Sequence, residues 1–365
     1  MSILPSVNGW NPAYPVAMPG DQPVRVLIVD DSAVMRSFLE RLFAARADID
    51  IVGTLPTATQ AFDFLGRERV DIILLDHEMP GQKGLEALPR MMEAGQGAHV
   101  VMLSSHCQRG SKVAVAALSM GASDALPKPS RTYPVSAFVE ALVERFRRLA
   151  AARRRSVGGR TDHRLRIFPP GFCLNCLGIG ASTGGIRTLA ALFAGLNGDA
   201  LGVPVLVTQH LPEAFIPYYA QQVARMTDLP VSIARPDQPI LPDHVYIAPG
   251  DHSLSCRRDS DGVRIALADQ HDLLTGTRPS VNAMFTGMAE CYGTGALGIV
   301  LTGIGRDGTA GAGRIVEAGG AVIAQDEESS VVWGMPGSVT RAGLACATLH
   351  PEKMSEYVRA QAGRR

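Results

Sequence analysis

The sequence has few aromatic residues, no net charge and no long apolar run. Only 5% of its 365 residues are aromatic, and 35 Lys and Arg balance 35 Asp and Glu. A balanced charge produces no global field that would attract nucleic acid or anionic lipid, so function must be sought in local sites. No apolar run approaches the roughly 20 residues that cross a bilayer, which predicts no membrane insertion.

The cysteines lack the pattern of a secreted, disulfide-linked domain. All six are scattered without framework-like spacing, which favours a reducing cytoplasm. Cys173 and Cys176 form a lone C-x-x-C, and because no second ligand pair accompanies them we favour buried strand residues over a redox or zinc pair. Residues 1–23 hold five prolines and no basic region, which predicts a disordered tail rather than a signal peptide, with Met18 as an alternative start.

The sequence does contain two series of short Val, Ile and Leu runs that alternate with helical stretches. This rhythm predicts an α/β protein of two domains: a (βα)5 domain over 24–143, and a doubly wound, mainly parallel-sheet domain over 172–365 with a small hairpin insertion. The Arg-rich segment 144–171 between them is predicted to be a linker, a solvated helix end followed by a flexible tether, in preference to a nucleic-acid-binding arm. The predicted strands span 24–29, 49–53, 72–75, 100–103 and 125–126, then 174–179, 203–208, 231–234, 245–248, 297–301 and 321–324, with a hairpin of 254–256 and 263–267.

Acidic and polar residues follow successive strands of the first domain: Asp30 and Asp31, then Asp76, Ser104 and Lys128. Parallel strands present their carboxyl ends at one edge, so these side chains can converge. Clustered carboxylates repel one another unless a cation neutralises them, and oxygen ligands suit Mg²⁺. Each residue alone could be a helix cap or a surface residue. Because all of them lie at successive strand ends, they predict a site for a metal ion and a transferred phosphoryl group.

Over roughly residues 24–152 the chain resembles the receiver domain of response regulators. The matching residues are Asp30-Asp31-Ser32, Asp76-His-Glu-Met-Pro with Gly84 beyond, Ser104, and Lys128-Pro129. The resemblance implies that Asp76 accepts the phosphoryl group, and it implies a cis peptide between Lys128 and Pro129. It also implies a Mg²⁺ ion held by Asp31, Asp76 and the Glu78 carbonyl with help from Asp30, and a phosphate held by Ser104 and Lys128.

One residue departs from the receiver pattern. Ala125 stands where an aromatic switch residue is often found, three positions before Lys128. We therefore expect phosphorylation to act on the surface through backbone and helix shifts more than through rotation of an aromatic ring.

In the second domain a serine, a histidine and an aspartate each follow a predicted strand. Ser182 lies in Gly180-Ala-Ser-Thr-Gly184, a G-x-S-x-G at a strand-to-helix turn. His210 and Asp307 follow later strands at the same edge, which is where a nucleophile, a general base and its orienting acid must meet. A dinucleotide-binding loop is the rival interpretation, but the next strand ends in Gln-His rather than in the acidic residue that would hold a ribose. Each of the three could also simply cap a helix or a strand.

The order Ser, His, Asp differs from that of α/β-hydrolases, so the fold must be another one. From about residue 174 to the C-terminus the chain looks like the catalytic domain of the chemotaxis protein-glutamate methylesterases, the CheB family. The motifs are Gly178-Ile-Gly-Ala-Ser-Thr-Gly-Gly185, Thr208-Gln-His-Leu-Pro212, Tyr246-Ile-Ala-Pro-Gly-Asp251, Arg278-Pro-Ser-Val281, Leu301-Thr-Gly-Ile-Gly-Arg-Asp-Gly308, Ala324-Gln-Asp-Glu327 and Gly334-Met-Pro336.

That resemblance implies a phosphorylation-regulated esterase. Its substrates would be glutamyl methyl esters, and certain glutamines, on methyl-accepting chemoreceptors. Ser182, His210 and Asp307 would form the catalytic triad, with Thr183 and the backbone at Ile304 supporting the transition state and no cofactor in the esterase site. The implied partners are these receptors and a chemotaxis-type histidine kinase, and the implied location is the cytoplasm, at receptor arrays.

Three further departures concern specificity: Ile304 where Met is frequent, Arg306 where Asn is usual, and Asn282 where Asp is usual. Arg306 adjoins the catalytic Asp307, so receptor preference is less fixed by the sequence than the reaction type. Three alternatives stay open: a binding module whose triad no longer turns over, a DNA-binding response regulator, and an esterase serving a sensory array unrelated to swimming. The second is disfavoured because no helix-turn-helix pattern is visible.

Overall fold

The N-terminal domain is a five-stranded parallel sheet covered by helices. The computed structural model describes residues 22–44, 46–104, 108–130, 134–155, 164–198, 200–268 and 278–362. The strand order is β2-β1-β3-β4-β5. The strands are β1 (Val24–Val29), β2 (Ile49–Leu55), β3 (Ile72–Asp76), β4 (His99–Ser104) and β5 (Asp124–Pro127), and the helices are α1 (Ala33–Ala44), α2 (Ala58–Leu65), α3 (Gly84–Ala94), α4 (Gln108–Met120) and α5 (Val135–Arg155).

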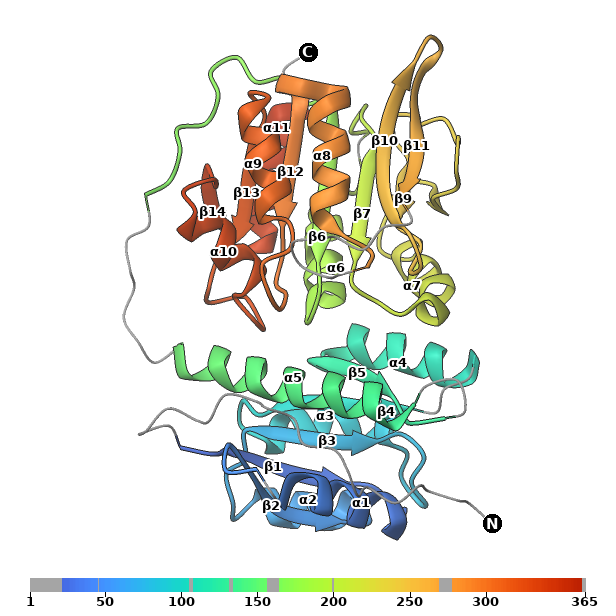
Figure 1. Ribbon diagram of the computed structural model, residues 1–365, viewed down its shortest axis with the longest axis vertical. Coiled ribbons are helices and arrows are strands. Elements are labelled where there is room, and N and C mark those ends of the chain that lie inside the picture. The colour runs from blue at the N-terminus through green and yellow to red at the C-terminus, as the bar shows by residue number, and fades with distance from the viewer. Residues whose placement is uncertain are drawn as a thin grey trace.

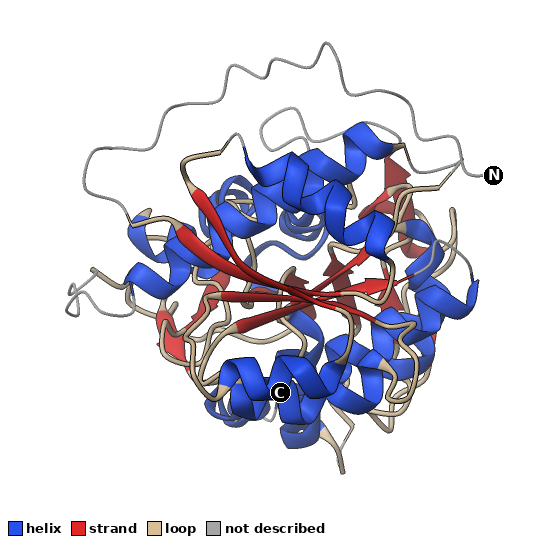
Figure 2. Ribbon diagram, turned by 90° about the horizontal axis from the view of Figure 1, so that it is seen from below, coloured by secondary structure: helices blue, strands red, loops and turns tan. Residues whose placement is uncertain are grey.

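Both faces of this sheet are buried, as the continuous apolar runs of its strands require. Residues of β3 alternate between two hydrophobic clusters, one containing Ile73 and Leu75 and the other Ile72 and Leu74. Figure 2 shows the strands lying between layers of helices. The strand β3 ends at Asp76, which places that carboxylate at the carboxyl edge of the sheet.

The C-terminal domain contains a seven-stranded parallel sheet of order β14-β13-β12-β6-β7-β9-β8 and a separate antiparallel hairpin, β10-β11. The prediction of an α/β protein with these two sheets and a hairpin is confirmed. The strands are β6 (Cys176–Ala181), β7 (Val205–Gln209), β8 (Val231–Ile233), β9 (Val245–Ile247), β10 (Ser253–Asp259), β11 (Gly262–Ala268), β12 (Ala296–Val300), β13 (Ala321–Gln325) and β14 (Ala347–Leu349).

Helices cover both faces of this second sheet (Figure 1). They are α6 (Gly185–Leu196), α7 (Ile216–Val223), α8 (Val281–Tyr292), α9 (Thr309–Glu317), α10 (Met335–Arg341) and α11 (Pro351–Ala362), with short 3-10 turns η1 (Glu213–Phe215) and η2 (Gly293–Gly295). The central strands β12, β6 and β7 are adjacent, so the loops that follow them share one edge. That edge faces the N-terminal domain in Figure 1.

Helix α5 continues through Arg155, so residues 144–155 of the predicted linker are helical. The prediction ended the domain where arginines accumulate, but Phe146 and Leu149 keep the helix buried against the sheet. Residues 156–163 of the linker and residues 1–21 of the predicted tail lie outside the described part of the chain. The prediction of a cis peptide bond between Lys128 and Pro129 is wrong. Among the described residues, the cis bond joins Arg278 and Pro279.

The two domains are in contact through α4 and α5. Helix α4 contacts α6, α7 and η1 of the C-terminal domain. At the other end of the contact, Phe146 and Leu149 of α5 belong to the same hydrophobic cluster as Val332, with Ile304 packed against it. In Figure 1 both helices lie between the two sheets.

Candidate active site

Ser182 lies in a tight turn between β6 and α6. Gly184 adopts a left-handed conformation with φ of 79°, which an L residue with a side chain rarely adopts, and the helix begins at the next residue. The Ser182 carbonyl accepts bonds from the Gly185 N–H at 2.9 Å and from the Gln209 side-chain amide at 2.7 Å. A Cβ on Gly185 would lie 2.4 Å from Gln209 Oε1, so only glycine fits there. These contacts fix the serine at the amino end of a helix.

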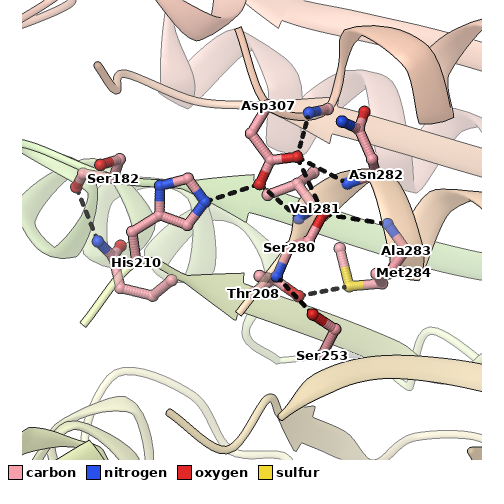
Figure 3. A network of polar contacts seen from close by, with 12 residues as sticks. Ser182, Thr208, His210, Ser253, Ser280, Val281, Asn282, Ala283, Met284 and Asp307 are labelled. Carbon is pink, nitrogen blue, oxygen red and sulfur yellow. Dashed lines mark hydrogen bonds and ion pairs between the residues drawn. The ribbon is translucent and has the colours of Figure 1, made fainter. Parts of the chain in front are cut away.

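His210 follows β7 and reaches Asp307, which follows β12. Its Nε2 lies 2.8 Å from Asp307 Oδ2. Because a carboxylate only accepts, Nε2 carries the proton, and the neutral ring then keeps a lone pair on Nδ1. Figure 3 shows that other ring nitrogen turned toward Ser182. No hydrogen bond from Ser182 Oγ to His210 is present among the described residues.

The amino end of α8 holds Asp307 in place. Backbone N–H groups of Val281 and Asn282 donate to its two oxygens at 2.7 and 3.0 Å, and Ser280 Oγ donates at 3.1 Å. The carboxylate is 1% exposed. Burial alone would raise the pKa of Asp307, but the bond from His210 and the backbone donors outweigh it and hold the pKa below its ordinary value. Asp307 is therefore ionised at neutral pH. Figure 3 shows the hydrogen-bond donors that surround its carboxylate.

The sequence did not reveal this role of α8. Ser280 is the N-cap of α8, and a serine N-cap implies free N–H groups in the next turn that can bind an anion. The structure brings those groups to Asp307 across a chain separation of about 25 residues. Asn282, one of the departures from the family pattern, accepts a bond from the Gly311 N–H at 2.8 Å and so ties α8 to α9.

A methyl group at position 180 should disturb the site through α8. A Cβ on Gly180 would lie 2.3 Å from Val281 Cγ1, and the Val281 N–H is a donor to Asp307. We expect Gly180→Ala to lower the free energy of unfolding by about 1–3 kcal/mol, as overpacking does, and to lower esterase activity. Urea denaturation measures the first effect.

The control is Gly313→Ala in α9, where a new Cβ meets nothing within 4 Å. Alanine should stabilise that helix by about 0.5–1 kcal/mol. A Gly180→Ala protein as stable as the original would contradict the packing described here.

The acidic residues of the N-terminal domain also meet. Carboxylate oxygens of Asp30, Asp31 and Asp76 all lie within 4.8 Å of one another. Lys128 Nζ lies 2.9 Å from Asp30 Oδ2 and 2.8 Å from Asp76 Oδ2. Burial and the neighbouring Asp30 charge raise the pKa of Asp76, and Lys128 offsets only part of that rise.

Two of the carboxylate oxygens at this cluster, Asp30 Oδ2 and Asp76 Oδ2, are paired among the described residues with Lys128 alone. Asp76 Oδ1 and Ser104 Oγ are buried with no hydrogen-bond partner in the described part of the chain. Buried polar groups in native proteins nearly always have partners. An oxygen-only donor set with an unsatisfied carboxylate is typical of a Mg²⁺ site, and the residues present fit that ion. The Glu78 backbone near this carboxylate lowers the pKa of Asp76 in part.

Comparison with known proteins places both sites in a family. A response regulator receiver domain model matches residues 26–139, and a CheB methylesterase model matches residues 177–358. A protein-glutamate methylesterase/protein-glutamine glutaminase of Azospirillum brasilense is 35% identical over 96% of this chain and 96% of its own length. The chain belongs to the CheB methylesterase family.

Other relatives that carry this name are similar over most of the chain as well. One from Caulobacter vibrioides is 37% identical over 93% of this chain and 99% of its own, and one from Pseudomonas aeruginosa is 36% identical over 94% and 98%. As in this family, a receiver domain precedes the methylesterase domain. Within the described residues, no helix has the length and apolar character that crossing a bilayer requires.

The two residues named as transition-state supports lie at the contact between the receiver and the methylesterase domain. Thr183 Oγ1 donates to Asp124 Oδ2 of β5 at 3.1 Å, and Asp124 also accepts from Arg145 at 2.8 Å. Ile304 packs against the cluster that contains Phe146 of α5. No sequence pattern pointed to Asp124, because its partner lies 59 residues away in another domain.

Proposed function

We propose that this chain hydrolyses glutamyl methyl esters, and deamidates glutamines, on methyl-accepting chemoreceptors, and that phosphorylation of Asp76 controls the rate. The observation that carries the proposal is the alignment of Ser182, His210 and Asp307 at one edge of the second sheet. The names of the relatives, protein-glutamate methylesterase and protein-glutamine glutaminase, supply the substrate class.

In the proposed reaction Ser182 Oγ attacks the ester carbonyl while His210 Nδ1 takes its proton. Asp307 stays ionised and stabilises the imidazolium that forms, since its pKa is held low by His210 and the α8 backbone donors. His210 then protonates the departing methanol. Water, activated by the same ring, hydrolyses the acyl-enzyme and releases the glutamate. For a glutamine the leaving group is ammonia.

Thr183 and the backbone at Ile304 are the proposed supports of the oxyanion. Thr183 directly follows the nucleophile and precedes the amino end of α6, where the helix dipole favours a negative charge. Both residues are engaged with the receiver in this structure. The Thr183 hydroxyl is therefore available to substrate only when the receiver moves.

The receiver cluster is proposed to bind Mg²⁺ through Asp31, Asp76 and the Glu78 carbonyl, with Asp30 assisting. The ion would neutralise the phosphoryl group and the crowded carboxylates. Asp76 Oδ1, which has no hydrogen-bond partner, is the proposed acceptor atom. Ser104 and Lys128 would hold the phosphate oxygens, and the donor would be a chemotaxis-type histidine kinase on the cytoplasmic side, at receptor arrays.

Coupling between the phosphorylation site at Asp76 and the esterase site at Ser182 is proposed to run along β5. Lys128, which binds Asp76 and Asp30, follows the end of this strand, and Asp124 at its start binds Thr183 beside the nucleophile. A phosphoryl group on Asp76 would draw Lys128 toward its oxygens and away from the carboxylates. A shift of β5 would then reach the Asp124–Thr183 hydrogen bond and uncover the active site.

Removing that hydrogen bond should partly release the unphosphorylated enzyme. We expect Asp124→Ala to raise the basal rate of methanol release, because Thr183 is freed and the receiver contact is weakened. The matched control is Glu68→Ala, which removes an exposed receiver ion pair with Arg25 and should leave the rate unchanged. A basal rate that is the same in both variants would argue against the coupling.

The proposed function is tested by incubating the protein with a methylated receptor fragment, acetyl phosphate and Mg²⁺. Methanol should appear from the methyl esters and ammonia from an amidated fragment. The competing hypothesis, a binding module whose triad no longer turns over, predicts receptor binding with neither product.

A further inference from the structure

Helix α8 and the hairpin strand β10 bring two cysteines together in the core of the methylesterase domain. Cys256 lies on β10 and Cys291 near the carboxyl end of α8, and both side chains belong to one buried cluster. The backbones are close because Gly287, one helical turn before Cys291, has no side chain: a Cβ there would lie 2.7 Å from the Cys256 nitrogen. Both cysteines are free thiols.

The two thiols differ in their surroundings. The neighbouring Cys256 thiol and the nearby Arg258 guanidinium lower the pKa of Cys291, against the effects of burial and Glu290. The neighbouring Cys291, together with burial, raises the pKa of Cys256. Arg258 is anchored beside Cys291, since its Nη2 donates to the Cys291 carbonyl. Cys291 is thus the thiol disposed to ionise, and Cys256 its neutral neighbour.

We propose that Cys256 and Cys291 are a thiol pair that hydroperoxides oxidise to a disulfide. The Cys291 thiolate attacks one oxygen of the hydroperoxide, the O–O bond breaks, and the other oxygen leaves as water or alcohol after taking a proton. The Cys256 thiol then attacks the sulfenic sulfur of Cys291. An S–S bond forms, the S–O bond breaks, and the hydroxyl leaves as water with the Cys256 proton. One hydroperoxide is reduced and two thiols are oxidised.

A third cysteine of the same cluster is not part of the proposed pair. Cys176 on β6 is 0% exposed, whereas Cys291 retains 7% and Cys256 5%. Burial raises the pKa of Cys176 far above its ordinary value, which keeps the thiol protonated and unreactive. Cys176 forms a C-x-x-C with Cys173 in the sequence, but the cysteine paired here with Cys291 lies on β10, 80 residues after Cys176.

The disulfide would fasten the hairpin to the helix that holds the catalytic acid. At its other end α8 already contacts β10, because the Ser280 N–H donates to Ser253 Oγ at 3.1 Å. A second link at Cys291 would pin the helix to the hairpin at both ends. We therefore expect the oxidised protein to unfold at a higher temperature than the reduced one.

The test is a peptide map of the full-length protein treated with hydrogen peroxide and digested without reductant. We expect one cross-linked pair, the Cys256 and Cys291 peptides, which separates again on reduction. Cys291→Ser should abolish the cross-link. Cys256→Ser should leave Cys291 as a sulfenic acid that dimedone labels. Cys346→Ser, at a cysteine outside the cluster, should cross-link like the unmodified protein.

The map of the unmodified protein decides the matter even if a variant folds poorly. A peroxide-treated protein in which residues 256 and 291 remain unlinked, or are linked to other cysteines, overturns the proposal. The assignment is independent of the esterase proposal, because the map reads thiols and not methanol.

Discussion

Ser182→Ala is expected to lower kcat for methanol release by about 10⁶-fold, the loss typical of removing the nucleophile of a serine triad. The hydroxyl is the atom that forms the acyl-enzyme, and no other hydroxyl is held by the turn between β6 and α6 in the same position relative to His210. Receptor binding should persist, since the side chain is small and half-buried. Methanol release from a methylated receptor fragment measures the effect.

The matched control is Ser355→Ala. Ser355 is buried, lies on α11 and donates to the Glu352 carbonyl, away from the triad. Its loss should cost a little stability and leave kcat intact. If Ser182→Ala kept a substantial part of the original rate, another residue would have to be the nucleophile.

Asp307→Asn should lower kcat by about 10⁴-fold, as in other triads, while KM changes little. An amide cannot neutralise the imidazolium, and its NH₂ group can donate to His210 Nε2 and so favour the wrong tautomer. It would also meet the Val281 and Asn282 N–H groups, which now donate to the carboxylate. Steady-state kinetics of both parameters test this split.

The same substitution should change the response of stability to acid. The folded-state pKa of Asp307 lies below its ordinary value, so this carboxylate stabilises the fold fully above the unfolded-state pKa. That contribution disappears as the pH falls through the folded-state pKa. The Asn variant should therefore lose less stability on acidification. Asp237→Asn, at an exposed hairpin ion pair, is the control and should keep the original acid profile.

The sequence predicted the sheets because they depend on local signals. Val and Ile runs bounded by glycines mark buried parallel strands, and residues directly after such strands must lie at one edge. Ser182, His210 and Asp307 each follow a strand, so the rule of strand ends predicts that they meet. The structure joins His210 to Asp307, and the contact of Ser182 with His210 stays a prediction. Strand bounds differ by one to three residues, as the shift of β6 to Cys176–Ala181 and the extension of β10 to Ser253–Asp259 illustrate.

Contacts between distant elements were not predictable in the same way. The edge strand β14 has only three residues, all half-buried, so its apolar signal is weak. The Asp124–Thr183 bond and the Cys256–Cys291 contact depend on how domains and layers pack, and no residue pattern encodes them. The cis peptide was expected at Lys128–Pro129 by resemblance alone, and the structure has it at another X–Pro bond.

Ala125 is a position where the sequence prediction and the structure can be compared. It lies in β5 and is 4% exposed, packed in the core. Because it is an alanine, it has no ring that could rotate between the surface and the interior. The residue before it, Asp124, accepts a hydrogen bond from Thr183 of the methylesterase domain. The expectation that the signal passes through the backbone of this segment therefore stays a prediction, now with a defined end point at Thr183.

The most direct test of the account is the rate of methanol release with and without a small phosphodonor, in the original protein and in Asp76→Asn. Acetyl phosphate with Mg²⁺ should accelerate the original protein, and removal of Mg²⁺ by EDTA should prevent the acceleration. Asp76→Asn should show no acceleration at all. Equal acceleration in both proteins, or a rate in the original protein that ignores the phosphodonor, would contradict control of the Ser182 site by the receiver.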